Sequence, residues 1–128
     1  MQTLIKTLLK DKILLIAVFI TLLIGYLSLR TIDFSPIQLS HVDKIFHTIA
    51  YFILGLAWLL SFPKSFKKNK LKYAIVFSCI IYGIVIEVLQ ATLTTYRTGS
   101  LLDVLANSIG VIVAMILFKP IYKKIIAI

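Results

Sequence analysis

The residues of this chain that can take part in acid–base or binding chemistry recur at helical spacing inside long apolar stretches. Asp43, His47 and Tyr51 are each four residues apart, so one face of a helix carries all three. Asp103 and Asn107 have the same spacing in a later stretch. A carboxylate one turn from an imidazole can orient it as a general base. Carboxylate, amide and phenol groups can also hydrogen-bond a polar ligand.

A third stretch carries Glu87 and, three residues later, Gln90, and Arg97 follows just beyond it. A charged side chain at the middle of a bilayer costs about 2.5–3.5 kcal/mol, so Glu87 has to face neighbouring helices and find a partner or a proton there. Arg97 offers a planar fork that suits phosphate or carboxylate. We expect the polar groups of the three stretches to meet at one depth, roughly 7–10 Å below the outer ends of their helices.

The elements that must position these groups are four apolar runs, each long enough to cross a bilayer. A helix rises about 1.5 Å per residue, so about 20 residues cross the hydrocarbon core. We therefore predict an all-α fold, a polytopic membrane protein with four transmembrane helices in a bundle, forming a single domain over residues 1–128. Residues 1–10 fit either a separate interfacial helix or an extension of the first span. The predicted helices cover residues 12–30, 43–62, 71–94 and 101–119.

The composition and charge of the chain agree with a membrane protein. Of the 128 residues, 60% are apolar, which excludes an ordinary soluble domain and a disordered chain. Eleven of the fourteen basic residues lie in residues 6–12, 64–72 and 119–124, so the positive-inside rule predicts that both termini and the middle connection face the cytoplasm. The basic excess then marks orientation, and we expect no nucleic-acid partner. The polar groups fall in the outer half of the bundle.

The two inward-running helices begin with similar segments. Ser40-His-Val-Asp43 is echoed by Ser100-Leu-Leu-Asp103, and the polar residue four positions later is His47 in one and Asn107 in the other. Such an echo fits two parallel hairpin repeats related by an axis along the membrane normal. It also fits two unrelated helices that share capping chemistry, because Ser-x-x-Asp is close to a capping box.

The ordered set of polar residues resembles the VanZ-like family of small bacterial integral membrane proteins. The resemblance covers most of residues 40–115. The positions that carry it are Asp43-Lys44-x2-His47-x3-Tyr51-x3-Gly55, followed by Glu87-x2-Gln90-x6-Arg97-x5-Asp103-x3-Asn107-x2-Gly110.

This resemblance implies a location in the bacterial cytoplasmic membrane, as part of the cell envelope. The namesake of the family is associated with low-level resistance to teicoplanin, a glycopeptide antibiotic with a lipid tail, so a role in antibiotic resistance is also implied. The resemblance supplies no mechanism and no cofactor.

Our first hypothesis is that the polar cluster binds an amphiphilic molecule of the outer leaflet or the cell wall, such as a lipid, a lipid-linked precursor or a lipoglycopeptide. Arg97 would contact an anionic group, and the remaining side chains would hydrogen-bond the polar part of the ligand. The partner of the chain is then the lipid bilayer and one of its components. The predicted site consists of Asp43, His47, Tyr51, Glu87, Gln90, Arg97, Asp103 and Asn107.

Three other hypotheses remain open for the same residues. In an enzyme acting on a lipid-linked substrate, His47 and Glu87 would handle the proton, although no serine or cysteine nucleophile is well placed. As plain structure, the cluster would only hold helices together, each bond contributing about 0.6 kcal/mol. A metal site built from His47, Asp43, Glu87 and Asp103 lacks a tight ligand motif, so we predict neither a bound metal nor another cofactor. The oligomeric state stays open.

Overall fold

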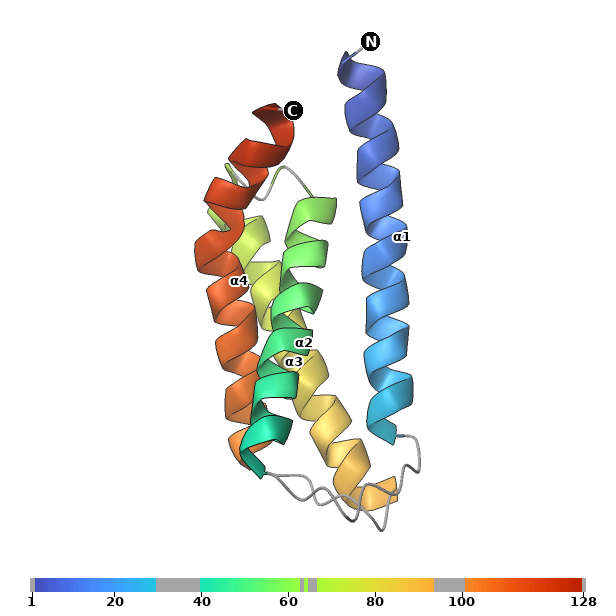
Figure 1. Ribbon diagram of the computed structural model, residues 1–128, viewed down its shortest axis with the longest axis vertical. Coiled ribbons are helices and arrows are strands. Elements are labelled where there is room, and N and C mark those ends of the chain that lie inside the picture. The colour runs from blue at the N-terminus through green and yellow to red at the C-terminus, as the bar shows by residue number, and fades with distance from the viewer. Residues whose placement is uncertain (1, 30–39, 63, 65–66, 94–100, 128) are drawn as a thin grey trace.

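The computed structural model describes residues 2–29, 40–62, 64, 67–93 and 101–127. It contains four helices: α1 (Gln2–Leu29), α2 (Ser40–Ser61), α3 (Asn69–Leu93) and α4 (Leu101–Ala127). The helices form an elongated bundle in which α2, α3 and α4 pack together and α1 lies along one side (Figure 1). All four are long and apolar enough to cross a membrane. The prediction of an all-α bundle of four membrane helices is therefore confirmed.

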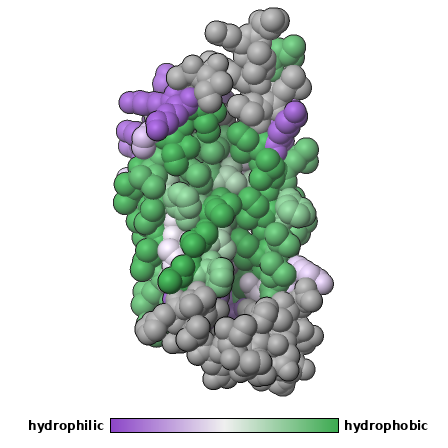
Figure 2. All heavy atoms as spheres, in the orientation of Figure 1, coloured by the Kyte–Doolittle hydropathy of each residue, from purple (hydrophilic) through white to green (hydrophobic). Residues whose placement is uncertain are grey.

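The surface of the bundle matches a membrane environment. Large apolar side chains such as Phe19, Phe77 and Ile116 are more than half exposed. Hydrophobic residues cover the middle of the molecule (Figure 2). The hydrophilic side chains visible in this view gather mainly at the end where α2 connects to α3. That end carries exposed lysines of the connection and of the C-terminal part of α4. The two chain termini lie at the same end (Figure 1).

Two helix boundaries differ from the sequence-based expectation. α1 runs without interruption from Gln2 to Leu29, so residues 2–10 belong to the same helix as the first candidate span, Asp11–Leu29, and do not form a separate helix. α4 passes through Pro120, and its predicted end near residue 119 was too early. Proline removes one backbone hydrogen bond. The helix continues because Phe118 is buried on one side of Pro120 and its ring packs 5.7 Å from that of Tyr122 on the other side.

The tightest packing joins α2 to α4. A Cβ atom added to Gly110 would lie 2.2 Å from the carbonyl oxygen of Thr48 and 2.9 Å from the backbone nitrogen of Phe52. The backbones of the two helices therefore touch at this level, as small residues allow in membrane bundles. This contact sets how far α4 lies from α2, and it lies one turn from Asn107 on α4.

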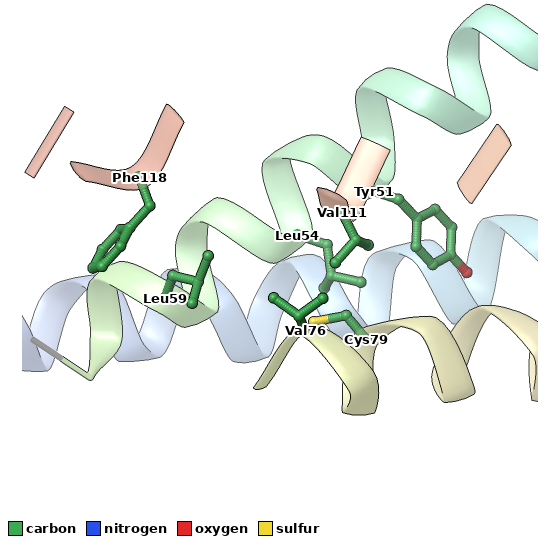
Figure 3. Packing of buried hydrophobic residues seen from close by; sticks show 7 residues of the cluster. All are labelled: Tyr51, Leu54, Leu59, Val76, Cys79, Val111 and Phe118. Carbon is green, nitrogen blue, oxygen red and sulfur yellow. The ribbon is translucent and has the colours of Figure 1, made fainter. Parts of the chain in front are cut away.

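A core of buried apolar side chains runs along the axis of the bundle, from Tyr51 to Phe118 (Figure 3). α2, α3 and α4 contribute all of its fully buried members. The thiol of Cys79 belongs to this core and forms no disulfide. In the part of the chain that the structure describes, α1 packs on α2 and α3 and makes no contact with α4. The polar site is thus built by α2, α3 and α4, with α1 as a flanking helix.

Candidate functional site

The three central helices bring an imidazole, a carboxylate and an amide together inside the bundle. The ring nitrogen Nδ1 of His47 on α2 lies 3.1 Å from Oδ1 of Asn107 on α4 and 3.8 Å from Oε1 of Glu87 on α3. The amide oxygen of Asn107 can accept a hydrogen bond from Nδ1 of His47 when this nitrogen carries a proton. Glu87 is 4% exposed and Asn107 is 1% exposed. The predicted convergence of these three residues is present in the structure.

A fourth predicted residue, Asp103, joins the group through an ion pair. Its Oδ1 accepts a hydrogen bond from Nζ of Lys44 on α2, and Asp103 is buried whereas Lys44 is half-buried. The ammonium group balances one carboxylate at the level of the cluster. Lys44 was not among the site residues predicted from the sequence. Its position next to Asp43 in the quoted motif was the signal that could have placed it in the site.

Two hydrogen-bond donors in this region are buried and have no hydrogen-bond partner among the described residues. They are the hydroxyl of Tyr51 and Nδ2 of Asn107. Both side chains border Gly83 on α3, where an added Cβ atom would lie 3.1 Å from Cε1 of Tyr51 and 3.3 Å from Nδ2 of Asn107. The absence of a side chain at Gly83 therefore leaves room for the two donors. A buried donor without an acceptor costs about 1–3 kcal/mol, so this pair requires an explanation.

Gln90 lies on the same helix as Glu87 but makes a different contact. Its Nε2 donates a hydrogen bond of 2.8 Å to the backbone carbonyl of Ser28, which ties α3 to α1. Gln90 is 2% exposed. Its amide therefore fixes the flanking helix beside the cluster, a contact that spacing alone did not predict.

Two predicted site residues lie outside what the structure describes. Asp43 belongs to α2, but its side chain is not among the described ones, and Arg97 follows the end of α3. Their assignment to the site stays a prediction.

The cluster has donor atoms that can hold a cation. One ligand atom each from His47, Glu87 and Asp103 lies within 4.8 Å of the others. One imidazole and two carboxylates suit Zn²⁺ or Mn²⁺, although Zn²⁺ sites need ligand distances of about 2.0–2.2 Å, so the three groups would have to draw together. The ammonium of Lys44 already pairs with Asp103. In the structure these side chains are joined by hydrogen bonds and ion pairs, and they could hold a cation only after moving closer together.

The family of the chain is shown by comparison with models of protein families. The sequence model of the VanZ/LLP1 family matches residues 3–125 of the chain, which is nearly its whole length. Neither the curated proteins nor the solved structures include a significant match. The family match is consistent with the resemblance found at the polar positions of α2, α3 and α4.

Proposed function

Since the chain belongs to the VanZ/LLP1 family and is a multi-pass membrane protein, we propose that it binds the polar group of an amphiphilic molecule from the outer leaflet of the bacterial cytoplasmic membrane. The class includes membrane lipids, lipid-linked cell-wall precursors and lipoglycopeptides. The binding site would be the cluster of His47, Glu87, Asp103 and Asn107, with Tyr51 at its inner edge.

The observation that carries this proposal is the pair of unpartnered donors. Buried polar groups in native proteins are nearly always hydrogen-bonded, and an exception calls for a ligand, an ion or a water molecule. The hydroxyl of Tyr51 and Nδ2 of Asn107 both offer a proton to an acceptor oxygen. Phosphate, sugar and amide groups of envelope molecules supply such oxygens, whereas a lipid tail does not.

The charge distribution supports the outer leaflet as the source of the ligand. The cluster lies towards the end of the bundle opposite the chain termini, and eleven basic residues lie near the end with the termini. The positive-inside rule orients the lysine-rich end towards the cytoplasm. Both termini are then cytoplasmic, and the cluster faces the outer leaflet.

A lipid-retention experiment tests the proposal. Purified protein in dodecyl maltoside is incubated with a bacterial polar lipid extract and washed, and the retained lipids are identified and counted by mass spectrometry. We expect Tyr51→Phe and Asn107→Ala to weaken retention about fivefold each, because one hydrogen bond contributes about 1 kcal/mol. Ser108→Ala is the matched control, since the hydroxyl of Ser108 bonds to its own helix at Val104. Equal retention in all four proteins would overturn the proposal.

Resistance to teicoplanin is a finer form of the same proposal. The lipid tail would anchor such a glycopeptide in the outer leaflet, next to the proposed site. A glycopeptide without a lipid tail would reach the site less readily. The test compares the inhibitory concentrations of both kinds of glycopeptide for cells with and without the protein. Protection against both drugs to the same degree, or against neither, would contradict this role.

The contact between His47 and Glu87 favours a second candidate function, that of an enzyme. Nδ1 and Oε1 are 3.8 Å apart, and a small approach of the two groups would let them exchange a proton as general acid and base. The substrate would be a lipid-linked molecule held in the same cluster. Turnover of labelled lipid-linked precursors that is equal in the native protein and in His47→Ala would exclude this function.

A further inference from the structure

A cavity of about 370 Å³ lies between α1, α2 and α3, on the side of the polar cluster that faces the chain termini. Its wall extends from Leu54 on α2 to Phe62, the residue after the end of α2, and from Tyr82 to Ala74 on α3. Each stretch spans eight residue steps, which is about 12 Å along a helix axis. The cavity is therefore elongated parallel to the helices. Its volume falls within the range of about 300–1,000 Å³ that is usual for ligand sites.

The N–H and O–H groups of the cavity wall all donate hydrogen bonds within the protein. Nε1 of Trp58 donates to Oγ1 of Thr21 at 2.9 Å, and the hydroxyl of Tyr82 donates to the carbonyl of Thr21 at 2.5 Å. The hydroxyls of Thr21 and Ser78 donate to carbonyls of their own helices. Cys79, the remaining side chain with a heteroatom, behaves as a small apolar group. Water needs two to four polar partners to occupy a cavity, so the occupant that fits this wall is a hydrocarbon.

The cavity begins where the polar cluster ends. The ring of Tyr82, which lines the cavity, lies 6.4 Å from the ring of Tyr51. Leu54 and Cys79 follow Tyr51 along the bundle axis (Figure 3), and both line the cavity. Gly83, beside the unpartnered donors, is the next residue after Tyr82. A molecule whose polar group meets the donors would thus have the cavity near it, on the side that faces the chain termini.

We propose that this cavity holds one hydrocarbon chain of the same amphiphile whose polar group is bound by the cluster. The inference rests on the proposed function and narrows it to ligands that carry an acyl or other long alkyl chain. Inside a membrane, a chain gains little hydrophobic free energy by leaving the lipid, because lipid tails are equally apolar. The polar cluster would therefore supply most of the affinity, and the cavity would select for a chain of suitable shape.

The only tryptophan of the protein makes the cavity directly observable. Trp58 lines it, and bromine atoms quench tryptophan fluorescence at short range. We would brominate the acyl double bonds of the bacterial polar lipid extract and titrate it into purified protein in dodecyl maltoside. We expect quenching that saturates at a low ratio of lipid to detergent, as specific binding requires. Unbrominated extract serves as the control for changes in the micelle.

Two matched substitutions on α3 separate the cavity from the general lipid surface. Both positions are exposed, but Ala74 lines the cavity and Ala91 does not. Ala74→Phe therefore adds a ring at the cavity wall, and Ala91→Phe adds the same ring elsewhere on α3. We expect the saturable quenching to disappear in Ala74→Phe and to persist in Ala91→Phe. If Ala74→Phe does not purify as a single species, Ser78→Leu fills the cavity with a smaller side chain.

The polar variants decide whether head and chain belong to one molecule. Tyr51→Phe should shift the saturable quenching to about fivefold higher lipid, which matches the loss of one hydrogen bond. Saturable quenching that is the same in Tyr51→Phe and in the native protein would overturn the proposal, because the hydrocarbon chain in the cavity would then belong to another lipid. A different result would overturn the cavity assignment alone. In that case lipid retention would still fall in the cluster variants, but quenching would rise linearly with lipid and would be equal in Ala74→Phe and Ala91→Phe. The proposed function would then stand without the cavity. If the cluster variants left lipid retention unchanged and Ala74→Phe left quenching unchanged, both the proposed function and the cavity assignment would be overturned.

Discussion

Replacing Gly110 by alanine should separate α2 from α4, and the size of the effect follows from the contact between their backbones. The new Cβ atom would lie 2.2 Å from the carbonyl oxygen of Thr48, whereas ordinary contact begins at about 3.4 Å. The helices would have to move apart by about 1.2 Å at this level. The obstacle is backbone, which cannot turn aside as a flexible side chain can.

A second glycine on the same interface provides the matched control. A Cβ atom added to Gly55 would lie 3.3 Å from Cβ of Ala114 and 3.4 Å from Cγ1 of Val111, which small shifts can accommodate. Alanine is favoured over glycine inside a helix by about 1 kcal/mol, so Gly55→Ala should be neutral or slightly stabilising. Overpacking costs about 1–3 kcal/mol and sometimes more, and the rigid backbone obstacle at Gly110 places this cost at the upper end. After the gain of about 1 kcal/mol in helix propensity, Gly110→Ala should lose about 2 kcal/mol of stability.

The assay is reversible unfolding in mixed micelles by sodium dodecyl sulfate, followed by far-ultraviolet circular dichroism. The denaturant midpoint of Gly110→Ala should fall clearly below that of the native protein, and the midpoint of Gly55→Ala should not. The lipid retention of Gly110→Ala should fall as well, because a displaced α4 carries Asn107 away from His47. Equal midpoints for the two variants would refute the close approach of the backbones at Gly110.

Three further outcomes are expected. Lys44→Met should destabilise the protein by about 1.5–3 kcal/mol in the same unfolding assay, because it leaves the carboxylate of Asp103 buried without its cation; a double variant with Asp103→Asn should regain part of the loss, and strictly additive effects would argue against the pair. Gln90→Leu should cost about 1 kcal/mol by removing the bond to the carbonyl of Ser28, and an unchanged unfolding midpoint would contradict that contact. A green fluorescent protein fused to the C-terminus should be fluorescent and an alkaline phosphatase fused there inactive, whereas the reverse result would invert the proposed orientation.

The sequence was sufficient to predict the four spans and the four members of the cluster. Run length decides whether a helix can cross a bilayer, and the high cost of a buried charge forces Glu87 towards the other helices. Because His47 and Asn107 lie at a similar distance from the starts of their helices, their meeting with Glu87 also followed from counting residues. These predictions depend on distance along a helix, which the sequence contains directly.

The contacts that sequence did not predict depend on which helix lies next to which face. Periodicity shows that Gln90 shares a face with Glu87, but only packing shows that its amide reaches α1. Lys44 lies beside a predicted site residue, yet its partner on α4 depends on how closely the two helices approach. The cavity beside Trp58 is likewise a property of three helices together and has no counterpart in any one of them.

α1 has the least distinctive sequence of the four helices, yet its position decides whether the cavity exists. Two side chains of α3 hold it by its backbone carbonyls, Tyr82 at Thr21 and Gln90 at Ser28. Gly25 makes the first contact feasible, because an added Cβ atom there would lie 2.9 Å from the hydroxyl of Tyr82. One bond lies beside the cavity and the other beside the polar cluster, so both levels of the proposed site depend on the same helix. A sequence argument that ranks helices by their polar residues therefore undervalues α1. This helix contributes part of the cavity wall and two backbone carbonyls that accept hydrogen bonds from α3.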